Sequence, residues 1–154
     1  RIKQLSVGQL IRLAWVFAGR PLLIRPTLRA TKRTMQICDR LYGKAHHKNG
    51  KENAFRHALW NILICRNCRK RTKSDEKSAI WTEKITYLYE KVTKNDRLDQ
   101  HMDLQNNRLG IKWFKENLFE NEAEIIDFLQ KKLENAKKMT KIEEIENTLL
   151  YISE

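Results

Sequence analysis

Residues 51–68 read KENAFRHALWNILICRNC, which predicts one long helix. Asn53, His57 and Asn61 recur in it at every fourth position, so one stripe of an otherwise apolar helix is polar. Burial of such a stripe costs free energy unless every group is hydrogen-bonded or the stripe lines a cavity. The segment therefore predicts a central helix that brings polar side chains to a shared site.

The rest of the chain is expected to be helical as well. The 154 residues include only 5 glycines and 2 prolines, and 41% are hydrophobic, which favours one all-α domain over residues 1–154 and disfavours an all-β fold. No repeat, low-complexity tract or convincing β-strand is visible. We predict a bundle of about six to seven helices, drawn from residues 7–18, 27–42, 51–68, 74–92, 98–109, 112–119, 122–136 and 142–152.

Several boundaries of these helices can be predicted from single residues. Ser74 is expected to cap the helix over 74–92, and Gly110 to end the helix over 98–109. The basic run 69–73 reads as a connector. In the helix over 27–42, Leu28 is expected on the apolar face, together with Thr31, Met35 and Cys38.

Two more helices carry polar stripes. They consist of Glu83, Tyr87 and Glu90, and of Asp99, Asp103, Asn106 or Asn107, and Gly110. Ala54 and Ala58 are small and would let another helix, or a substrate, approach the first stripe closely. Packed together, the three stripes would form one site within residues 46–110 that suits acid–base or metal-assisted chemistry. The alternatives are a hydrogen-bonded core histidine, solvated helix faces and a helix C-terminal turn.

The charge is distributed unevenly along the chain. Residues 1–73 contain 18 Lys and Arg against two acidic residues, a net charge of +16, whereas residues 74–154 contain 13 against 17, a net charge of −4. Such a basic half attracts anionic partners such as nucleic acid, lipid headgroups or an acidic protein surface. The alternative is that the charge only keeps the protein in solution.

The three cysteines predict no disulfide scaffold. Cys65 and Cys68 form a single Cys-x-x-Cys, which could be half a zinc site or a redox pair. No second Cys-x-x-Cys exists, so zinc would have to recruit Cys38 or a histidine from elsewhere in the chain. We expect all three to be small apolar core residues.

The most apolar stretch, residues 10–24, is interrupted by Arg12, Arg20 and Pro21 and is too short to span a bilayer. We expect a core helix there, with an interfacial helix as the alternative. No cleavable secretory signal is visible.

Two segments together resemble a known type of domain. Residues 46–61 read HHKNGKENAFRHALWN and residues 103–110 read DLQNNRLG. They resemble an uncharacterised bacterial domain family, typical of Bacteroidetes, whose members carry an AFRHA-x-W-N helix and a later D-L-H-N-N-x-x-G segment. Members occur as stand-alone proteins and at the ends of toxin-like or wall-associated secreted proteins, and the resemblance covers roughly residues 20–112.

The chain departs from this pattern at two positions. The family resemblance implies a histidine where this chain has Tyr89, just before Glu90, and another where it has Gln105. A phenol or an amide does not readily replace an imidazole as metal ligand or base. Either the chemistry rests on the remaining residues, or this member has kept the fold without catalysis.

The resemblance and the stripes together give the expected roles. We expect His57 to act as acid or base, oriented by Glu90 or Asp103, and Arg56 to bind an anionic group as a bidentate fork. The expected substrate-binding residues are Arg56, Asn53, Asn61, Asn107 and His47. The metal ligands are unknown, and a divalent metal would be compatible with these residue types.

The leading functional hypothesis is an interbacterial, toxin-like effector that reaches the target cell through a contact-dependent secretion system and acts at the envelope. It would be a hydrolase of a phosphate-bearing envelope substrate or of nucleic acid, and a cognate immunity protein is an expected partner. The alternative is a non-catalytic effector that binds and blocks an envelope protein or membrane target. A nucleic-acid-binding module is a weaker third hypothesis, because no recognised binding motif is present.

Overall fold

The computed structural model describes residues 17–93, 96–142 and 147–153, and within these the chain forms five α-helices and one two-stranded sheet. In chain order the elements are α2 (Pro21–Tyr42), the short 3₁₀ helix η2 (Ala45–His47), α3 (Lys51–Thr72), α4 (Asp75–Val92), α5 (Arg97–Glu116), α6 (Glu122–Glu134), β1 (Lys137–Lys138) and β2 (Leu150–Tyr151). The predicted all-α class is confirmed.

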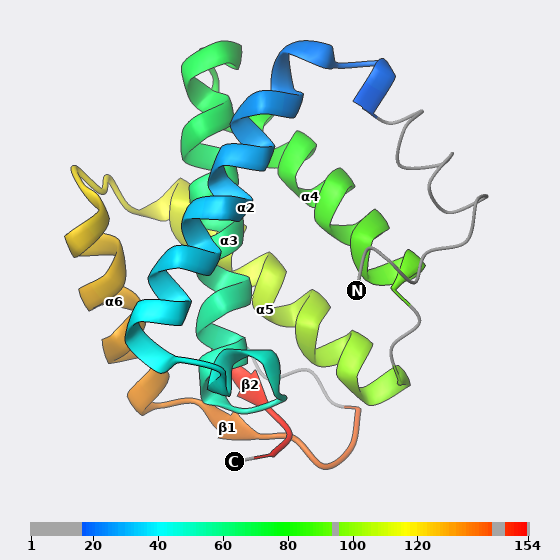
Figure 1. The fold of residues 1–154 in the computed structure, drawn as a ribbon, viewed down its shortest axis with the longest axis vertical. Coiled ribbons are helices and arrows are strands. Elements are labelled where there is room, and N and C mark those ends of the chain that lie inside the picture. Colours follow the sequence, from blue (N-terminus) through cyan, green and yellow to red (C-terminus); the bar gives the residue numbers. More distant parts are fainter. Residues whose placement is uncertain (1–16, 94–95, 143–146, 154) are drawn as a thin grey trace.

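Helix α3 is the centre of the fold. It packs against α2, α4, α5 and α6, and in Figure 1 it lies behind α2, with α6 on one side and α4 and α5 on the other. Nearly every residue from Asn53 to Cys65 is buried, so α3 has no broad solvent-facing side in this part. Its polar residues are therefore enclosed by neighbouring helices.

Helix α2 begins six residues before the predicted start at Thr27. Pro21 lies in its first turn, where the missing N–H has no helical partner to lose. Pro26 lies inside the helix, where it leaves one carbonyl of the exposed first turn without its usual donor. The prediction for Leu28 was wrong: it is 58% exposed, and the buried face of α2 instead includes Leu23, Ala30 and Ile37.

Helix α3 continues to Thr72, so the predicted basic connector over 69–73 is for the most part helix. Basic side chains favour the C-terminal end of a helix because the helix dipole is negative there. Arg69, Lys70 and Arg71 form this last turn, and Lys73 ends the helix in the left-handed conformation with φ 56°. Ser74 then caps α4 as predicted, because its hydroxyl accepts from the backbone N–H of Lys77 at 3.2 Å.

Gly110 does not end a helix, and this prediction was wrong. It lies inside α5, where the helix crosses α3, and a Cβ atom at this position would lie 2.5 Å from the carbonyl oxygen of Ala58. The absent side chain is what permits this close crossing, and the small size of Ala58 contributes to it. The two helices predicted over 98–109 and 112–119 are consequently one, which ends at Glu116.

The C-terminal part contains two short strands where none was predicted. β1 pairs with β2 in parallel, with Lys137 opposite Leu150. On its other side, Leu150 exchanges two hydrogen bonds with the side chain of Asn106, both 2.9 Å long. Leu150 also packs with Met102 and Met139 in a second, smaller core cluster. No helix is found among the described residues of 142–152, and the prediction of one was wrong.

The described residues thus contain five helices rather than six to seven. The helix predicted over 7–18 lies almost wholly outside them. Within the described ranges, no helix combines the length and the apolar character needed to cross a membrane.

Candidate functional site

Three consecutive helices bring one histidine and two carboxylates together. His57 of α3, Glu90 of α4 and Asp103 of α5 are each at most 2% exposed. The Nδ1 atom of His57 lies 3.5 Å from a Glu90 carboxylate oxygen, and its Nε2 atom lies 3.2 Å from Oδ1 of Asp103. We call these three residues the inner group.

Amide and hydroxyl side chains surround the inner group with hydrogen bonds. Oδ1 of Asn107 lies 3.0 Å from Nδ1 of His57 and accepts from the Asn61 amide at 2.7 Å. The Asn107 amide donates to Glu90 at 3.3 Å, and the Thr86 hydroxyl donates to Asn61 at 3.1 Å. The predicted stripe of α3 therefore converges with α4 and α5, and protein groups from all three helices orient the His57 ring.

Arg56 connects the His57 ring to the η2 turn. Its Nη1 atom donates to the carbonyl oxygen of His46 at 2.6 Å, and its Nη2 atom lies 3.0 Å from Nε2 of His57. A bidentate fork on an anionic group, as expected from the sequence, would have to share or replace these contacts. Arg56 therefore positions His57 and the η2 backbone as well as supplying a positive charge.

The contacts of His57 fit two arrangements of protons. In a neutral ring, Nδ1 donates to Asn107 and Nε2 accepts from Arg56, since a guanidinium can only donate. In a protonated ring, Nε2 donates to Asp103 at 3.2 Å and Nδ1 to Asn107, and the hydrogen bond from Arg56 to Nε2 is given up because both groups are then donors. With Arg56 charged, the second arrangement balances two buried carboxylates with two cations. A ring that can exchange one proton between these arrangements has the property required of an acid–base group.

A pocket of about 420 Å³ adjoins this arrangement, between α2, α3 and α4. Arg56, His57, Trp60 and Tyr89 form part of its wall, and His47 contributes from the η2 turn. The indole N–H of Trp60 donates to the Thr31 hydroxyl at 2.8 Å, and its ring meets that of Tyr89 edge to face at 5.3 Å. The pocket thus combines a cation and an imidazole with fixed aromatic walls, which suits an anionic ligand with an apolar part.

Other residues of the predicted stripes do not join the site. Glu83 and Tyr87 are exposed, although they share a nominal helix face with Glu90. Asp99 accepts from the Asn49 amide at 2.9 Å. Asn53 is buried and donates to the carbonyl oxygen of Lys48. These side chains fix loops and termini around the site, and Asn106 does the same for β2.

The two positions where this chain departs from the histidines that the resemblance implies have different surroundings. Tyr89 lines the pocket next to Trp60, so a histidine there would face the same space. Gln105 donates to the carbonyl oxygen of Thr148 at 3.1 Å. The first departure therefore changes the pocket wall, and the second lies where a side chain contacts the C-terminal segment.

The buried polar line on α4 was missed by the sequence reading. Ser78, Thr82, Thr86 and Glu90 recur at every fourth position and are all buried. The three hydroxyls each bond to a backbone carbonyl of α4 itself, which removes the cost of burying them. This spacing is visible in the sequence, and it would have identified Glu90 as buried and Glu83 as exposed.

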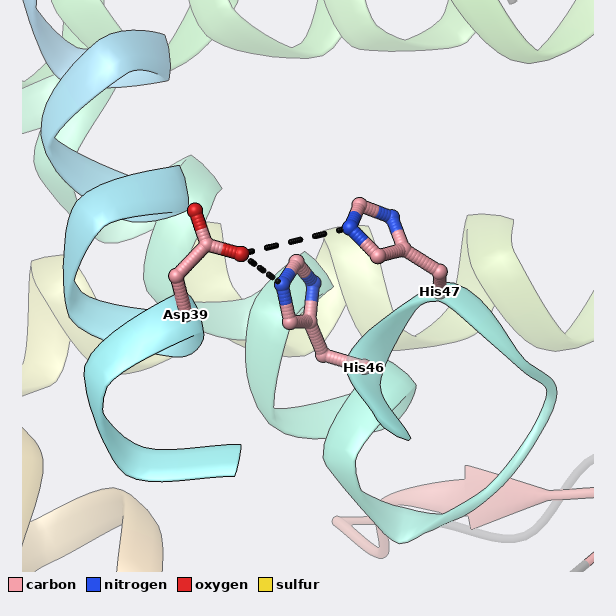
Figure 2. A group of neighbouring side chains, drawn as sticks. All are labelled: Asp39, His46 and His47. Atoms are coloured by element: carbon pink, nitrogen blue, oxygen red, sulfur yellow. Dashed lines mark hydrogen bonds and ion pairs between the residues drawn. The ribbon is translucent and has the colours of Figure 1, made fainter. Parts of the chain in front are cut away.

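A second histidine–carboxylate group was also missed. It consists of Asp39 at the end of α2 and of His46 and His47 in η2, and Figure 2 shows the three side chains pointing toward one another. Asp39 Oδ1 lies 2.9 Å from Nε2 of His46 and 4.0 Å from Nε2 of His47. We call these three residues the outer group. Its signal in the sequence was the His46-His47 pair, which begins seven residues after a lone acidic residue in a basic segment.

The cysteines are core residues, as predicted. All three are free and buried, and desolvation raises the pKa of the Cys38 and Cys65 thiols to about 12 and that of Cys68 to about 11. Thiols with so little thiolate at neutral pH are poor nucleophiles and poor metal ligands.

Comparison with known proteins gives one match. A family model described as "Domain of unknown function (DUF6973)" matches residues 14–137, which include every element from α2 to α6. Searches of curated proteins and of solved structures gave no significant match. Because the family model covers most of the chain, and covers both the inner and the outer group, this protein belongs to that uncharacterised domain family.

Proposed function

We propose that this protein is an antibacterial effector with hydrolase activity on a phosphate-bearing substrate, in which His57 acts as acid or base. The observation that carries the proposal is the position of Arg56 and His57 in the wall of one pocket, with Glu90 and Asp103 within ion-pair distance of the same imidazole ring. A cation and a histidine in the wall of one cavity, with two buried carboxylates in contact with that histidine, are parts that suit the hydrolysis of an anionic ester.

In this mechanism Arg56 attracts the phosphate group and holds the Nε2 edge of His57. When the phosphate replaces His57 as a partner of Arg56, Nε2 of the imidazole can take a proton from the attacking water, or, once protonated, give one to the leaving oxygen. Asp103 and Glu90 stabilise the imidazolium that forms, and Asn107 fixes the orientation of the ring through Nδ1. The carboxylates are positioning residues here, because they act through His57.

The pocket favours a substrate with two unlike parts. Arg56 and His47 would face the anionic part, while Trp60, Tyr89 and Met35 would face an apolar or ring-shaped part. A phosphate-bearing envelope component fits this description first, and a nucleotide or nucleic acid second. The basic half of the chain would concentrate either one near the pocket.

Delivery by a contact-dependent secretion system, action at the target-cell envelope and a cognate immunity protein are parts of the same proposal. They are supported by the resemblance to domains found at the ends of toxin-like and secreted proteins. They are independent of the pocket chemistry and need a separate test.

A second candidate function is a non-catalytic effector that binds and blocks an envelope protein or membrane target. Two observations favour it: Tyr89 and Gln105 replace the histidines that the resemblance implies, and His57 is only 2% exposed. In this case the inner group would serve as a buried hydrogen-bond network that rigidifies the helices.

The experiment compares growth of bacteria that express the protein in the cytoplasm or, with an added export signal, in the periplasm. Wild type is compared with His57→Gln and Arg56→Lys, and with His101→Gln, which removes an imidazole outside both groups. Circular dichroism verifies that each variant folds. In parallel, the purified proteins are incubated with anionic phospholipid vesicles and with nucleic acid, and products are measured.

Growth inhibition in one compartment that requires His57 and Arg56, but not His101, supports the hydrolase and identifies its compartment. Inhibition that persists in a folded His57→Gln variant favours the blocking effector. Absence of inhibition in both compartments contradicts the effector role, whereas product formation in the purified assay tests the hydrolase by itself.

A further inference from the structure

We propose that the outer group of Asp39, His46 and His47 is a binding site for a divalent transition-metal ion of the zinc class. Asp39 comes from the last turns of α2, and His46 and His47 come from the η2 turn. The two elements lie close enough for Asp39 and His46 to be within hydrogen-bond distance (Figure 2). The binding of the ion does not depend on the proposed catalytic role of His57.

The spacing of the ligand atoms fits such an ion. Ligand atoms of the three residues all lie within 4.8 Å of one another, and the Asp39 oxygen is 2.9 Å from one imidazole nitrogen and 4.0 Å from the other. Around a tetrahedral ion with bonds of about 2.0–2.1 Å, neighbouring ligand atoms are roughly 3.4 Å apart. The two measured separations bracket this value, and each would have to change by about half an ångström to reach it.

His46 and the η2 backbone are held in place before any ion binds. The His46 ring is fully buried, and its backbone carbonyl accepts from Arg56 at 2.6 Å. The η2 turn is closed by hydrogen bonds from His47 to Lys44 and from Lys48 to Ala45. As a result the two consecutive imidazoles lie with ring centroids 4.0 Å apart and an interplanar angle of 37°. His46 would therefore lose little side-chain freedom on binding.

The outer group is open on one side, unlike the inner group. The side chains of Asp39 and His47 are 59% and 50% exposed. Three protein ligands with an open position for water or substrate are typical of catalytic zinc sites, and two imidazoles with one carboxylate also suit Mn²⁺, Fe²⁺, Co²⁺ and Ni²⁺. Mg²⁺ and Ca²⁺ prefer oxygen ligands and are not expected to bind well.

The surrounding charge opposes a cation, and this limits the expected affinity. Arg40, Lys44 and Lys48 are exposed near the group in the sequence, and Arg56 contacts His46 directly. These charges repel a divalent ion by an amount that falls with salt. We therefore expect micromolar rather than picomolar binding, with no weakening when the salt concentration is raised.

The position of His47 connects the ion to the pocket. His47 lines the same cavity as Arg56 and His57, so an ion on Nε2 of His47 would lie at its rim. There it could coordinate an oxygen of the anionic substrate or a water molecule, and lower the pKa of that water. This part of the inference rests on the proposed function, whereas metal binding itself does not.

The experiment measures metal binding to the full chain without substrate. The purified protein is freed of metal with a chelator, then titrated with Zn²⁺ by calorimetry and with Co²⁺ by visible absorption, which reports the ligand geometry. The variants are Asp39→Asn and His47→Gln, both at exposed side chains. Their matched controls are Asp127→Asn on the exposed side of α6 and His101→Gln on α5.

We expect one equivalent of Zn²⁺ in wild type and in both controls, and binding at least about 100-fold weaker in Asp39→Asn and His47→Gln, because loss of an outer partner of a ligand alone costs about 10–100-fold. The proposal is overturned if wild type binds neither Zn²⁺ nor Co²⁺, or if the two variants bind as well as their controls. It is equally overturned if His57→Gln removes binding while Asp39→Asn does not, because the ion would then occupy the inner group.

The result also remains separate from the test of the proposed function. Metal binding with the expected variant pattern, in a protein that neither inhibits growth nor releases product, leaves the metal site standing without the hydrolase. A hydrolase that is fully active as Asp39→Asn would instead remove the ion from the mechanism.

Discussion

The inner and outer groups contain the same kinds of side chain, and Arg56 contacts a histidine of each, yet their surroundings differ. In the inner group, carboxylates and imidazole are at most 2% exposed and lie within ion-pair distance of one another, and Asn107 contacts His57 and Glu90. In the outer group only His46 is buried, while Asp39 and His47 are about half exposed. Burial makes the inner group costly to disturb, and exposure leaves the outer group available to a ligand.

The largest difference between the two groups is expected when one carboxylate is removed from each. Glu90→Ala removes a buried charge, takes away the acceptor of the Asn107 amide and creates a cavity. We therefore expect the free energy of unfolding to fall by about 3–5 kcal/mol. Asp39→Ala removes a carboxylate that water can replace, and should cost no more than about 1 kcal/mol. Urea unfolding followed by circular dichroism measures both.

Thiol labelling gives a second measurement of the stability of Glu90→Ala and Asp39→Ala. Burial raises the pKa of Cys65 to about 12, so almost no thiolate is present at pH 8 and labelling by a disulfide reagent requires opening of the core. Labelling should be faster in Glu90→Ala than in Asp39→Ala. Equal stability of the two variants would show that burial does not distinguish the groups.

The next largest effect concerns the helix crossing that holds the inner group. Gly110→Ala adds a Cβ atom 2.5 Å from the Ala58 carbonyl oxygen and 2.9 Å from Cβ of Asn61, which forces α3 and α5 apart. We expect a loss of about 1–3 kcal/mol. The sign is diagnostic, because the same change inside an ordinary helix stabilises by about 0.5–1 kcal/mol.

The outer group serves as the internal control for Gly110→Ala, because it lies on α2 and η2 rather than at this crossing. Titration of the variant with Co²⁺ should therefore give the wild-type affinity. A loss of stability together with a loss of Co²⁺ binding would mean that the two groups are structurally coupled.

A smaller effect is expected from one hydroxyl beside the inner group. Thr86→Val keeps the shape of the side chain but removes a hydroxyl whose one hydrogen is shared between the Thr82 carbonyl oxygen, at 2.9 Å, and Oδ1 of Asn61, at 3.1 Å, which should cost about 1–1.5 kcal/mol. Thr34→Val is the matched control, because this buried hydroxyl donates to a carbonyl of its own helix, Ala30, at 2.9 Å. Differential scanning calorimetry should find the larger decrease in melting temperature for Thr86→Val.

The smallest effect is expected from a substitution in the outer group. His47→Gln alters a half-exposed side chain at the pocket rim, so the free energy of unfolding should change by no more than about 0.5 kcal/mol. A change of several kcal/mol, measured by urea unfolding, would contradict the view that the outer group is built for a ligand rather than for stability.

Sequence patterns predicted the parts of this fold that depend on neighbours along the chain. The 3.6-residue periodicity and the Ser74 cap identified α4 correctly. The recurrence of Asn53, His57 and Asn61 at every fourth position identified the polar face of α3. Convergence of His57 with Glu90 and Asp103 was expected from three stripes on consecutive helices, and their distances agree with that expectation. The catalytic roles of these residues stay predictions.

The wrong predictions depend on contacts between distant segments. Gly110 looks like a helix end in isolation, and only the passage of Ala58 alongside it explains why it lies inside α5. Residues 142–152 have helical periodicity in the sequence. Leu150 is nevertheless extended, because it pairs with Lys137 of β1 on one side and hydrogen-bonds to the Asn106 side chain on the other. Asp39 and His47 lie together because η2 turns the chain back toward α2, and the His46-His47 pair was a weak local signal of this group.

The pairing of Asn106 with Leu150 also constrains how the protein is made. The two residues are separated by 44 positions, and Leu150 completes the small core with Met102 and Met139. During synthesis, all the described helices have therefore left the ribosome before this core can close. A nascent chain stalled just short of residue 150 would already contain every residue of both groups, while the turn of α5 that holds Asn107 would still await its last support.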